Sequence, residues 1–229
     1  MADLYIHQSK HYVAVDCIIF GFDTYELKLL CIKRNFEPKK GKWSLMGGFI
    51  EDNEGADEAA ERVLFELTGL KDIYLEQLQA YAEPGRDTAE RVISIAYYAL
   101  INSVKFDHKI SKNYDARWFG LNQIPDLIFD HKKMVYKAMK RLKRRCRYQP
   151  VGFELLSEKF TLPQLQNLYE NIFRREFDKR NFRKKILTYG ILNKLQEKDK
   201  NGSKKGAYYY QFDYKRYKEL TNKGFNFEI

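Results

Sequence analysis

The chain has 229 residues, of which 44% are hydrophobic and 15% are aromatic, and its formal net charge is +10. This composition excludes fibrous and disordered classes, and the length suits two domains better than one. Three widely spaced cysteines, Cys17, Cys31 and Cys146, do not make a disulfide scaffold and indicate a reducing compartment. No secretory signal and no apolar run long enough to cross a bilayer is visible. We therefore expect a soluble, cytoplasmic protein without a membrane partner.

The charge is distributed unevenly along the chain. Residues 1–136 contain 17 Lys+Arg and 21 Asp+Glu, which gives a net charge of −4. Residues 137–150 contain seven basic and no acidic residues, a net charge of +7, and residues 151–229 contain 17 basic and 10 acidic residues, another +7. The acidic N-terminal part and the basic C-terminal part are predicted to have different roles, with a polyanion as the partner of the basic part. The alternative is that the basic residues form a solvated surface.

The first part of the chain alternates strand and helix patterns. Runs rich in Val, Ile and Leu predict strands at residues 11–22, 26–34, 43–50, 74–82 and 91–101. Apolar residues at helical spacing predict helices at residues 57–68 and 130–148. We expect the first two strands to form a hairpin and the third to end in a turn at Gly47-Gly48. The second helix carries the basic run, and Pro150 follows it, so we place a domain boundary near residues 148–152.

The last part of the chain has a different pattern. Thr161 is a good helix cap with Pro163 in the first turn, and Asp178 caps a second helix that is predicted to end at Gly190. This second helix is expected to turn three apolar side chains inward, namely Phe182, Ile186 and Leu187. A strand at 192–198, a polar turn and a strand at 207–213 follow. The order helix, turn, helix, hairpin predicts a winged helix-turn-helix.

One motif with long spacing joins a strand, a loop and a helix. Its members are Gly48, Glu54, Arg62, Leu64, Glu66, Gly69 and Leu70. The motif resembles the Nudix box, which runs Gly, five residues, Glu, seven residues, then Arg-Glu-apolar-any-Glu-Glu-any-Gly-apolar. The resemblance implies an α/β fold, a Nudix α/β/α sandwich with a mixed sheet.

The acidic part of this motif is incomplete. Nudix hydrolases cleave diphosphates with divalent cations held by clustered glutamates. Val63 and Leu67 replace two of the three glutamates, so we expect no catalytic residue, no metal ion and no cofactor. Glu54 and Arg62 are expected to pair and to brace the loop on the helix, and Glu66 either does the same or binds a ligand hydroxyl. A Nudix hydrolase acting on ADP-ribose or a related nucleoside diphosphate is the alternative function.

The predicted second helix of the last part presents basic and amide side chains. Its candidate DNA contacts are Lys179, Arg180, Asn181, Arg183, Lys184 and Lys185, and Lys204 and Lys205 follow in the wing. Because arginine reads guanine and asparagine reads adenine with paired hydrogen bonds, Arg180, Asn181 and Arg183 are expected to read bases and the lysines to bind phosphates. Two alternatives stay open: a helix that only packs a small regulatory domain, and an RNA-binding or scaffold protein that uses the same surface.

These features together resemble a known family. A Nudix-like domain followed by Leu168-Tyr169-Glu170 and the basic run from Arg180 to Lys185 is similar to the Nudix-related transcriptional regulators (NrtR-like), over about residues 10–215. The resemblance implies a Nudix-like effector-sensing domain at 1–150, a winged helix DNA-binding domain at 151–229, a homodimer and a palindromic double-stranded operator. The wing departs from the family's usual Gly-Arg-Pro-Ala and reads Lys205-Gly206-Ala207-Tyr208.

The resemblance also suggests an effector. Members of the family that govern NAD metabolism sense ADP-ribose, whereas members whose Nudix box has lost its catalytic residues govern sugar use. This chain most resembles the arabinose-responsive members. It therefore implies a regulator of carbohydrate utilisation genes with L-arabinose as the effector. Charged and aromatic residues expected around the pocket are candidate sugar contacts, each with a structural role as the alternative. They are Asp16, Arg34, Trp43, Glu66, Glu83 and Arg91.

Overall fold

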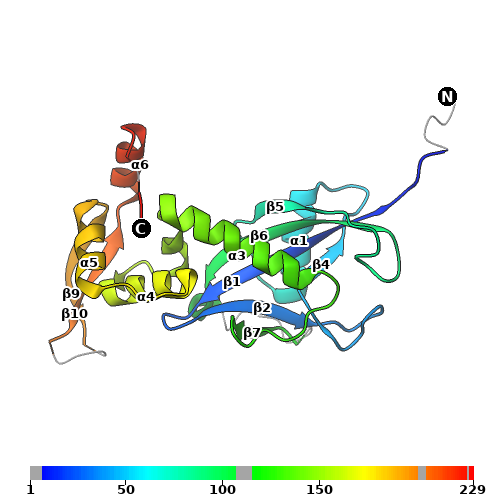
Figure 1. Ribbon diagram of the computed structural model, residues 1–229, viewed down its shortest axis with the longest axis horizontal. Helices are drawn as coiled ribbons and strands as arrows, with labels where there is room; N and C mark the ends of the chain where they lie inside the picture. The colour runs from blue at the N-terminus through cyan, green and yellow to red at the C-terminus, as the bar shows by residue number, and fades with distance from the viewer. Residues whose placement is uncertain (1–6, 107–114, 201–204, 226) are drawn as a thin grey trace.

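The computed structural model describes residues 7–106, 115–200, 205–225 and 227–229. Within these residues the N-terminal part forms one seven-stranded mixed sheet, with β1 parallel to β6 and antiparallel to β2 and β4. Its strands are β1 (Tyr12–Phe22), β2 (Leu27–Lys33), β3 (Trp43–Ser44), β4 (Met46–Phe49), β5 (Glu76–Tyr81), β6 (Val92–Asn102) and β7 (Arg117–Gly120). Helices α1 (Ala56–Thr68) and α3 (His131–Tyr148) cover opposite faces of this sheet, and the short α2 (Ser103–Phe106) follows β6 (Figure 1). The predicted hairpin and the α/β/α sandwich are confirmed.

Strand β1 divides its side chains between the two faces of the sheet. Successive side chains of a strand point to opposite sides. Val15, Cys17 and Ile19 pack into the core beneath α1, whereas Ile18 and Phe20 pack into the core beneath α3. Asp16 has the same parity as Ile18, so the strand turns its carboxylate toward the α3 face.

The paired glycines lie in a strand and not in the predicted turn. Gly47 and Gly48 belong to β4, where they pair with Asp16 and Val15 of β1. A Cβ atom on Gly47 would lie 2.4 Å from Asp16 Oδ1, and one on Gly48 would lie 2.7 Å from Val63 Cγ2 of α1. The glycines therefore serve close packing on both faces of the sheet. The predicted strand at 43–50 is interrupted at Leu45, which separates β3 from β4.

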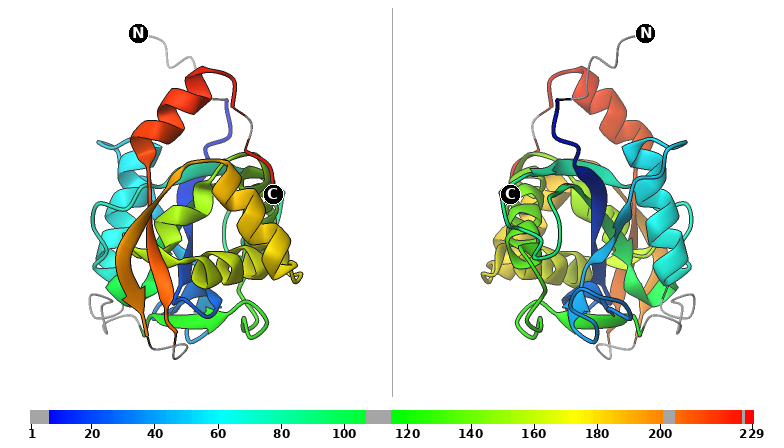
Figure 2. Two further views of the ribbon diagram at one scale, coloured as in Figure 1. Left: turned by 90° about the vertical axis from the view of Figure 1, so that its left-hand side faces the viewer. Right: turned by 90° about the vertical axis from the view of Figure 1, so that its right-hand side faces the viewer.

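The C-terminal part forms a winged helix (Figure 2). Its elements are the 3₁₀ helix η3 (Val151–Leu155), β8 (Phe160–Thr161), α4 (Leu162–Phe173), α5 (Lys179–Thr188), β9 (Leu192–Asp199), β10 (Ala207–Phe212) and α6 (Tyr214–Asn222). The side chain of Thr161 caps α4 and that of Asp178 caps α5, as predicted. Two expectations were wrong or incomplete. Leu187 is 43% exposed and not turned inward, and α6, which has no buried residue, was not predicted.

The two parts pack against each other. One hydrophobic cluster runs from the α3 face of the sheet into the winged helix, and the turn between β1 and β2 is hydrogen-bonded to α4. Asn167 Nδ2 donates to the carbonyl oxygens of Thr24 and Tyr25, at 2.8 and 2.9 Å, and the amide of Leu27 donates to Asn171 Oδ1 at 3.2 Å. The first winged-helix helix is thus fixed to the sheet. No helix within the described ranges has the length and apolar character needed to span a membrane.

Candidate effector site and nucleic-acid interface

A buried polar cluster lies between the sheet and the first turn of α3. Arg86, in the turn after β5, donates from Nε and Nη2 to the Asp130 carboxylate at 3.2 and 2.8 Å. Its Nη2 atom lies 3.6 Å from Asp16 Oδ2, which also accepts a hydrogen bond of 2.6 Å from Ser94. The side chains of Arg86, Asp16 and Asp130 are only 4, 8 and 11% exposed. One buried guanidinium group thus holds two carboxylates from elements far apart in sequence.

His131 extends the cluster into the core. The backbone amide of Leu45 donates to His131 Nδ1 at 3.1 Å, so the proton of a neutral ring is on Nε2, which lies 3.4 Å from Asp16 Oδ1. Burial lowers the pKa of His131 below its usual value of 6.5. Burial therefore favours the neutral imidazole, which faces the Asp16 carboxylate.

Arg86 and Asp130 also line an open groove of about 1170 Å³. Other lining residues include Tyr81, Glu83, Phe129 and Lys133. The Tyr81 hydroxyl is buried and forms no hydrogen bond with the described residues, and burial raises the pKa of Tyr81 to about 12. A buried hydroxyl without a partner beside a groove is a group that a polar ligand can satisfy.

The predicted effector contacts do not form a single site. Asp16 belongs to the polar cluster and Glu83 lines the groove. Arg34 lies nearby, with its guanidinium carbon 6.0 Å from the centre of the Phe129 ring, and burial lowers its pKa. Three further candidates do not line the groove. Trp43 packs edge-on against Phe119, Glu66 lies on α1, and Arg91 precedes β6 with a buried Nη1 atom unpartnered in the described residues.

Sequence reasoning missed Arg86, Asp130, Tyr81 and His131. Arg86 lies in an irregular turn, where no periodic pattern applies. Asp130 could have been found from the sequence, because an aspartate directly before a predicted helix is a typical N-cap residue. Its carboxylate makes no capping hydrogen bond and is bound to Arg86 instead.

The remaining charged residues of the Nudix-type motif are engaged with one arginine. Arg62 Nη2 lies 2.5 Å from Glu54 Oε1 and donates to the Phe49 carbonyl at 2.9 Å. Arg62 Nη1 lies 3.3 Å from Glu66. The hydrogen bonds from Arg62 lower the pKa of Glu54 to about 2. The expected brace between loop and helix is confirmed, and Glu66 joins it at the exposed surface.

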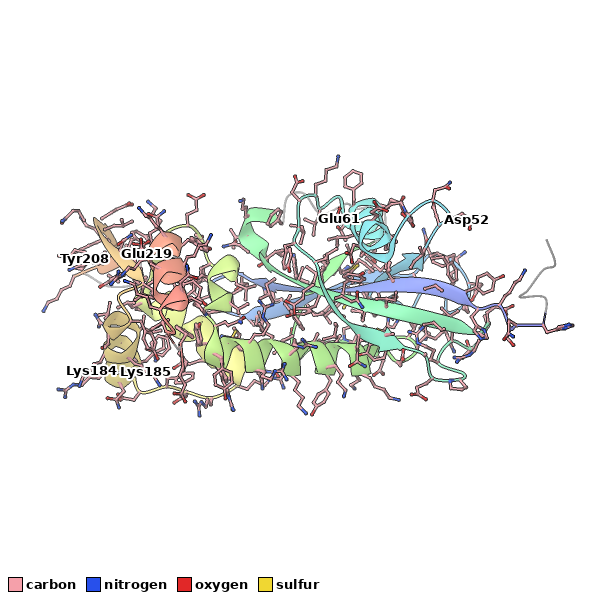
Figure 3. All side chains as sticks on the ribbon, turned by 90° about the horizontal axis from the view of Figure 1, so that it is seen from above. Asp52, Glu61, Lys184, Lys185, Tyr208 and Glu219 are labelled. Carbon is pink, nitrogen blue, oxygen red and sulfur yellow. The ribbon has the colours of Figure 1, made fainter. Side chains whose placement is uncertain are left out.

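The residues at the former acidic positions do not fit a divalent cation. Val63 is 2% and Leu67 is 9% exposed, and both pack into the core beneath α1. Divalent cations of this class require several oxygen ligands. In the part of the chain that the structure describes, no group of three or more His, Cys, Asp or Glu is arranged to hold a metal ion. Figure 3 shows α1, with Glu61 labelled, on the side of the sheet away from α3.

The predicted recognition helix α5 presents its basic side chains to solvent. Phe182 and Ile186 are buried, and all six predicted contacts on this helix are exposed. They are Lys179, Arg180, Asn181, Arg183, Lys184 and Lys185. Figure 3 shows Lys184 and Lys185 at the opposite end of the molecule from Asp52. The exposed face of α5 is the face that a recognition helix presents to a major groove.

The wing adds further cations beside an aromatic ring. Lys205 is exposed, and Lys204 lies outside the described residues. Lys194 Nζ and Lys198 Nζ of β9 lie 3.7 and 4.4 Å from the centre of the Tyr208 ring of β10. The order of strands in this sheet is β8-β10-β9, as in a winged helix whose hairpin follows the recognition helix.

The comparisons with known proteins match both parts of the chain. The NUDIX domain family matches residues 10–142 and the NrtR DNA-binding winged helix domain matches residues 152–212. The chain is 33% identical over 204 residues to the "ADPR responsive transcriptional repressor NtrR" of Acinetobacter baylyi, covering 87% of this chain and 81% of that protein. It is 37% identical over 138 residues to the ADP-ribose pyrophosphatase of Methanocaldococcus jannaschii, covering 60% of this chain and 76% of that enzyme.

Solved structures give the same result. Shewanella oneidensis NrtR in complex with a 27mer DNA superposes with a TM-score of 0.77 at 29% identity, covering 87% of this chain and 93% of that chain. The Nudix domain of the same protein, in complex with ADP ribose, superposes with a TM-score of 0.51 at 29% identity and covers 58% of this chain and 90% of that chain.

The fold and the exposed helix α5 define a DNA-binding regulator in which a Nudix domain precedes a winged helix. The chain belongs to the NrtR family of Nudix-related transcriptional regulators.

Proposed function

We propose that this chain is an effector-controlled transcription regulator that binds a palindromic operator as a homodimer. Residues 1–150 sense the effector and residues 151–229 bind DNA. The observation that carries the DNA-binding role is the exposed basic face of α5. Three buried free cysteines suit a reducing cytoplasm.

The effector site we propose is the groove beside Arg86 and Asp130. Carboxylates accept hydrogen bonds from sugar hydroxyls, guanidinium groups donate to sugar oxygens, and the Phe129 ring offers an apolar face. L-arabinose is our first candidate. It rests on the resemblance to arabinose-responsive regulators and on the two carboxylates of the groove, Glu83 and Asp130, and it assigns the regulator to carbohydrate utilisation genes.

ADP-ribose is the second candidate. The relative from Acinetobacter baylyi is described as ADPR responsive, and the Nudix domain from Shewanella oneidensis was solved with ADP ribose. Lysines also line the groove, namely Lys39, Lys132, Lys133 and Lys137. Cationic side chains suit a diphosphate, whereas a neutral pentose has no charge to pair with them.

We propose that the Nudix domain senses and does not hydrolyse its ligand. The pairing of Glu54 and Glu66 with Arg62 and the burial of Val63 and Leu67 support this role.

One titration separates the two effectors. Fluorescence anisotropy of a promoter fragment is measured with the purified protein alone, with L-arabinose, with D-xylose as a matched pentose control, and with ADP-ribose. A change in DNA affinity of about 5- to 150-fold with one ligand and not with D-xylose identifies the effector. In parallel, a ligand present at 100 times its Kd stabilises the protein by about 2.7 kcal/mol in thermal unfolding. Unchanged DNA affinity with both candidates rejects both of them.

A further inference from the structure

The chain ends beside three helices, with one buried ring among its last three residues. Phe227 is 1% exposed, and its ring centroid lies 5.1 Å from that of Tyr189, just after α5, and 6.4 Å from that of Tyr169 on α4. These residues lie beyond the winged-helix family match, which ends at residue 212.

The backbone of residues 227–229 joins α3 to the end of α5. The amide of Ile229 donates to the Arg147 carbonyl at 3.2 Å. Arg147 lies in the last turn of α3, where carbonyl groups have no partner within the helix. The Tyr189 hydroxyl donates to the Glu228 carbonyl, and the amide of Glu228 lies 3.3 Å from the same hydroxyl oxygen. We call residues 227–229 the strap.

The other end of α3 starts in the polar cluster. Asp130 directly precedes the helix and binds Arg86, and His131 is its first residue. An 18-residue helix is about 27 Å long. One rigid element therefore connects the groove to the strap, and the C-terminus lies beside the end of this element (Figure 1). The Tyr189 hydroxyl connects the strap to the end of α5.

A second contact between the Nudix-type part and the winged helix involves α4 and not α5. The turn between β1 and β2 is hydrogen-bonded to α4 through Asn167 and Asn171, and α4 precedes the recognition helix. The strap, in contrast, is bonded directly to Tyr189, the residue that ends α5.

We propose that the strap couples α3 to the recognition helix, so that a ligand which displaces the Arg86–Asp130 contact changes the position of α5 through residues 227–229. The inference rests on the proposed function, because it assigns a route from the effector groove to DNA. Ligand binding has this effect only if the ligand binds more tightly to one position of α3 than to another.

The test uses the full chain and two strap variants, Phe227→Ala and Tyr189→Phe. Tyr97→Phe is the matched control, because it also removes a tyrosine hydroxyl hydrogen bond, to Asp57, in the core beneath α1. DNA affinity is measured with and without L-arabinose and ADP-ribose, and hydrogen exchange of the α5 amides is measured without ligand.

Without effector, we expect the strap variants to bind DNA within about threefold of the wild-type affinity, since the basic face of α5 is unchanged. We expect the effector to change their DNA affinity much less than it changes that of the wild type, so that a 100-fold change, for example, falls to about fivefold or less. We also expect the α5 amides to exchange about tenfold faster. Tyr97→Phe should leave both quantities at wild-type values.

The outcomes separate the two proposals. If the wild type responds to an effector and Tyr189→Phe responds equally, with unchanged α5 exchange, the strap proposal is overturned and the proposed function stands. If the wild type responds to neither ligand, the effector proposal fails, and the exchange measurement still decides whether the strap holds α5. Where Phe227→Ala does not fold, Tyr189→Phe gives the answer.

Discussion

Arg86 and Asp130 are 44 residues apart in the chain and form two hydrogen bonds with each other. This contact joins the turn after β5 to the residue that precedes α3. It also completes the buried charge cluster, since Arg86 is the cation that faces both Asp130 and Asp16.

Replacing Arg86 should therefore be costly. Arg86→Met leaves two buried carboxylates without their cation, and breaking a buried pair in this way lowers the free energy of unfolding by about 3–5 kcal/mol. Urea denaturation followed by circular dichroism measures the loss. Glu66→Gln is the control. It removes only the ion pair between Glu66 and Arg62, where Glu66 is 52% exposed, and should cost at most about 1 kcal/mol. Equal losses for both variants would show that the cluster is not buried as described.

His131 should make stability depend on pH. Burial places the pKa of folded His131 below the unfolded value near 6.5. The unfolded state therefore binds more protons just below pH 6.5, so the contribution of the neutral ring is present above pH 6.5 and is lost as the pH falls. Denaturation midpoints between pH 8 and pH 5 measure this slope. His131→Gln should flatten the slope between pH 6.5 and 5, and a slope that persists in this variant contradicts the assignment.

Removing single basic side chains from helix α5 should weaken DNA binding. Arg180→Ala removes a predicted base contact and is expected to cost about 1–3 kcal/mol of binding free energy and to relax the sequence preference at one position. Lys184→Ala removes a predicted phosphate contact, so it should reduce the slope of log affinity against log salt by about 1. Lys10→Ala is the control, because it removes a cation next to the start of β1, at the far end of the molecule from α5 (Figure 1). Arg180→Ala with wild-type affinity at every salt concentration would remove α5 from the interface.

The protein should not hydrolyse ADP-ribose. Val63 and Leu67 are buried and Glu54 and Glu66 contact Arg62, so the motif offers fewer carboxylates for divalent cations than the Nudix box does. We expect no release of AMP above the background in Mg²⁺ or Mn²⁺, measured by chromatography. A metal-dependent rate that disappears in Glu66→Gln would establish an enzyme instead.

Local patterns in the sequence were sufficient for most elements. The hairpin of β1 and β2, the helices α1 and α3, and the caps at Thr161 and Asp178 follow from periodicity and capping chemistry, which act over a few residues. The spacing of the Nudix-type motif also predicted that Arg62 pairs with Glu54. In contrast, Gly47 and Gly48 were expected in a turn, because a pair of glycines carries the same local signal whether it permits a bend or close packing.

The sequence by itself determined the fold class, the basic helix α5 and the absence of two acidic residues from the motif, because each of these follows from neighbouring residues. Only the tertiary structure decided which charged groups meet. Asp16 and Glu66 were expected in one pocket, yet Asp16 faces α3 and Glu66 lies on α1, because the sheet stands between the two helices. Arg86, which holds the cluster together, comes from an irregular turn, and its partners are chosen by the packing of distant segments.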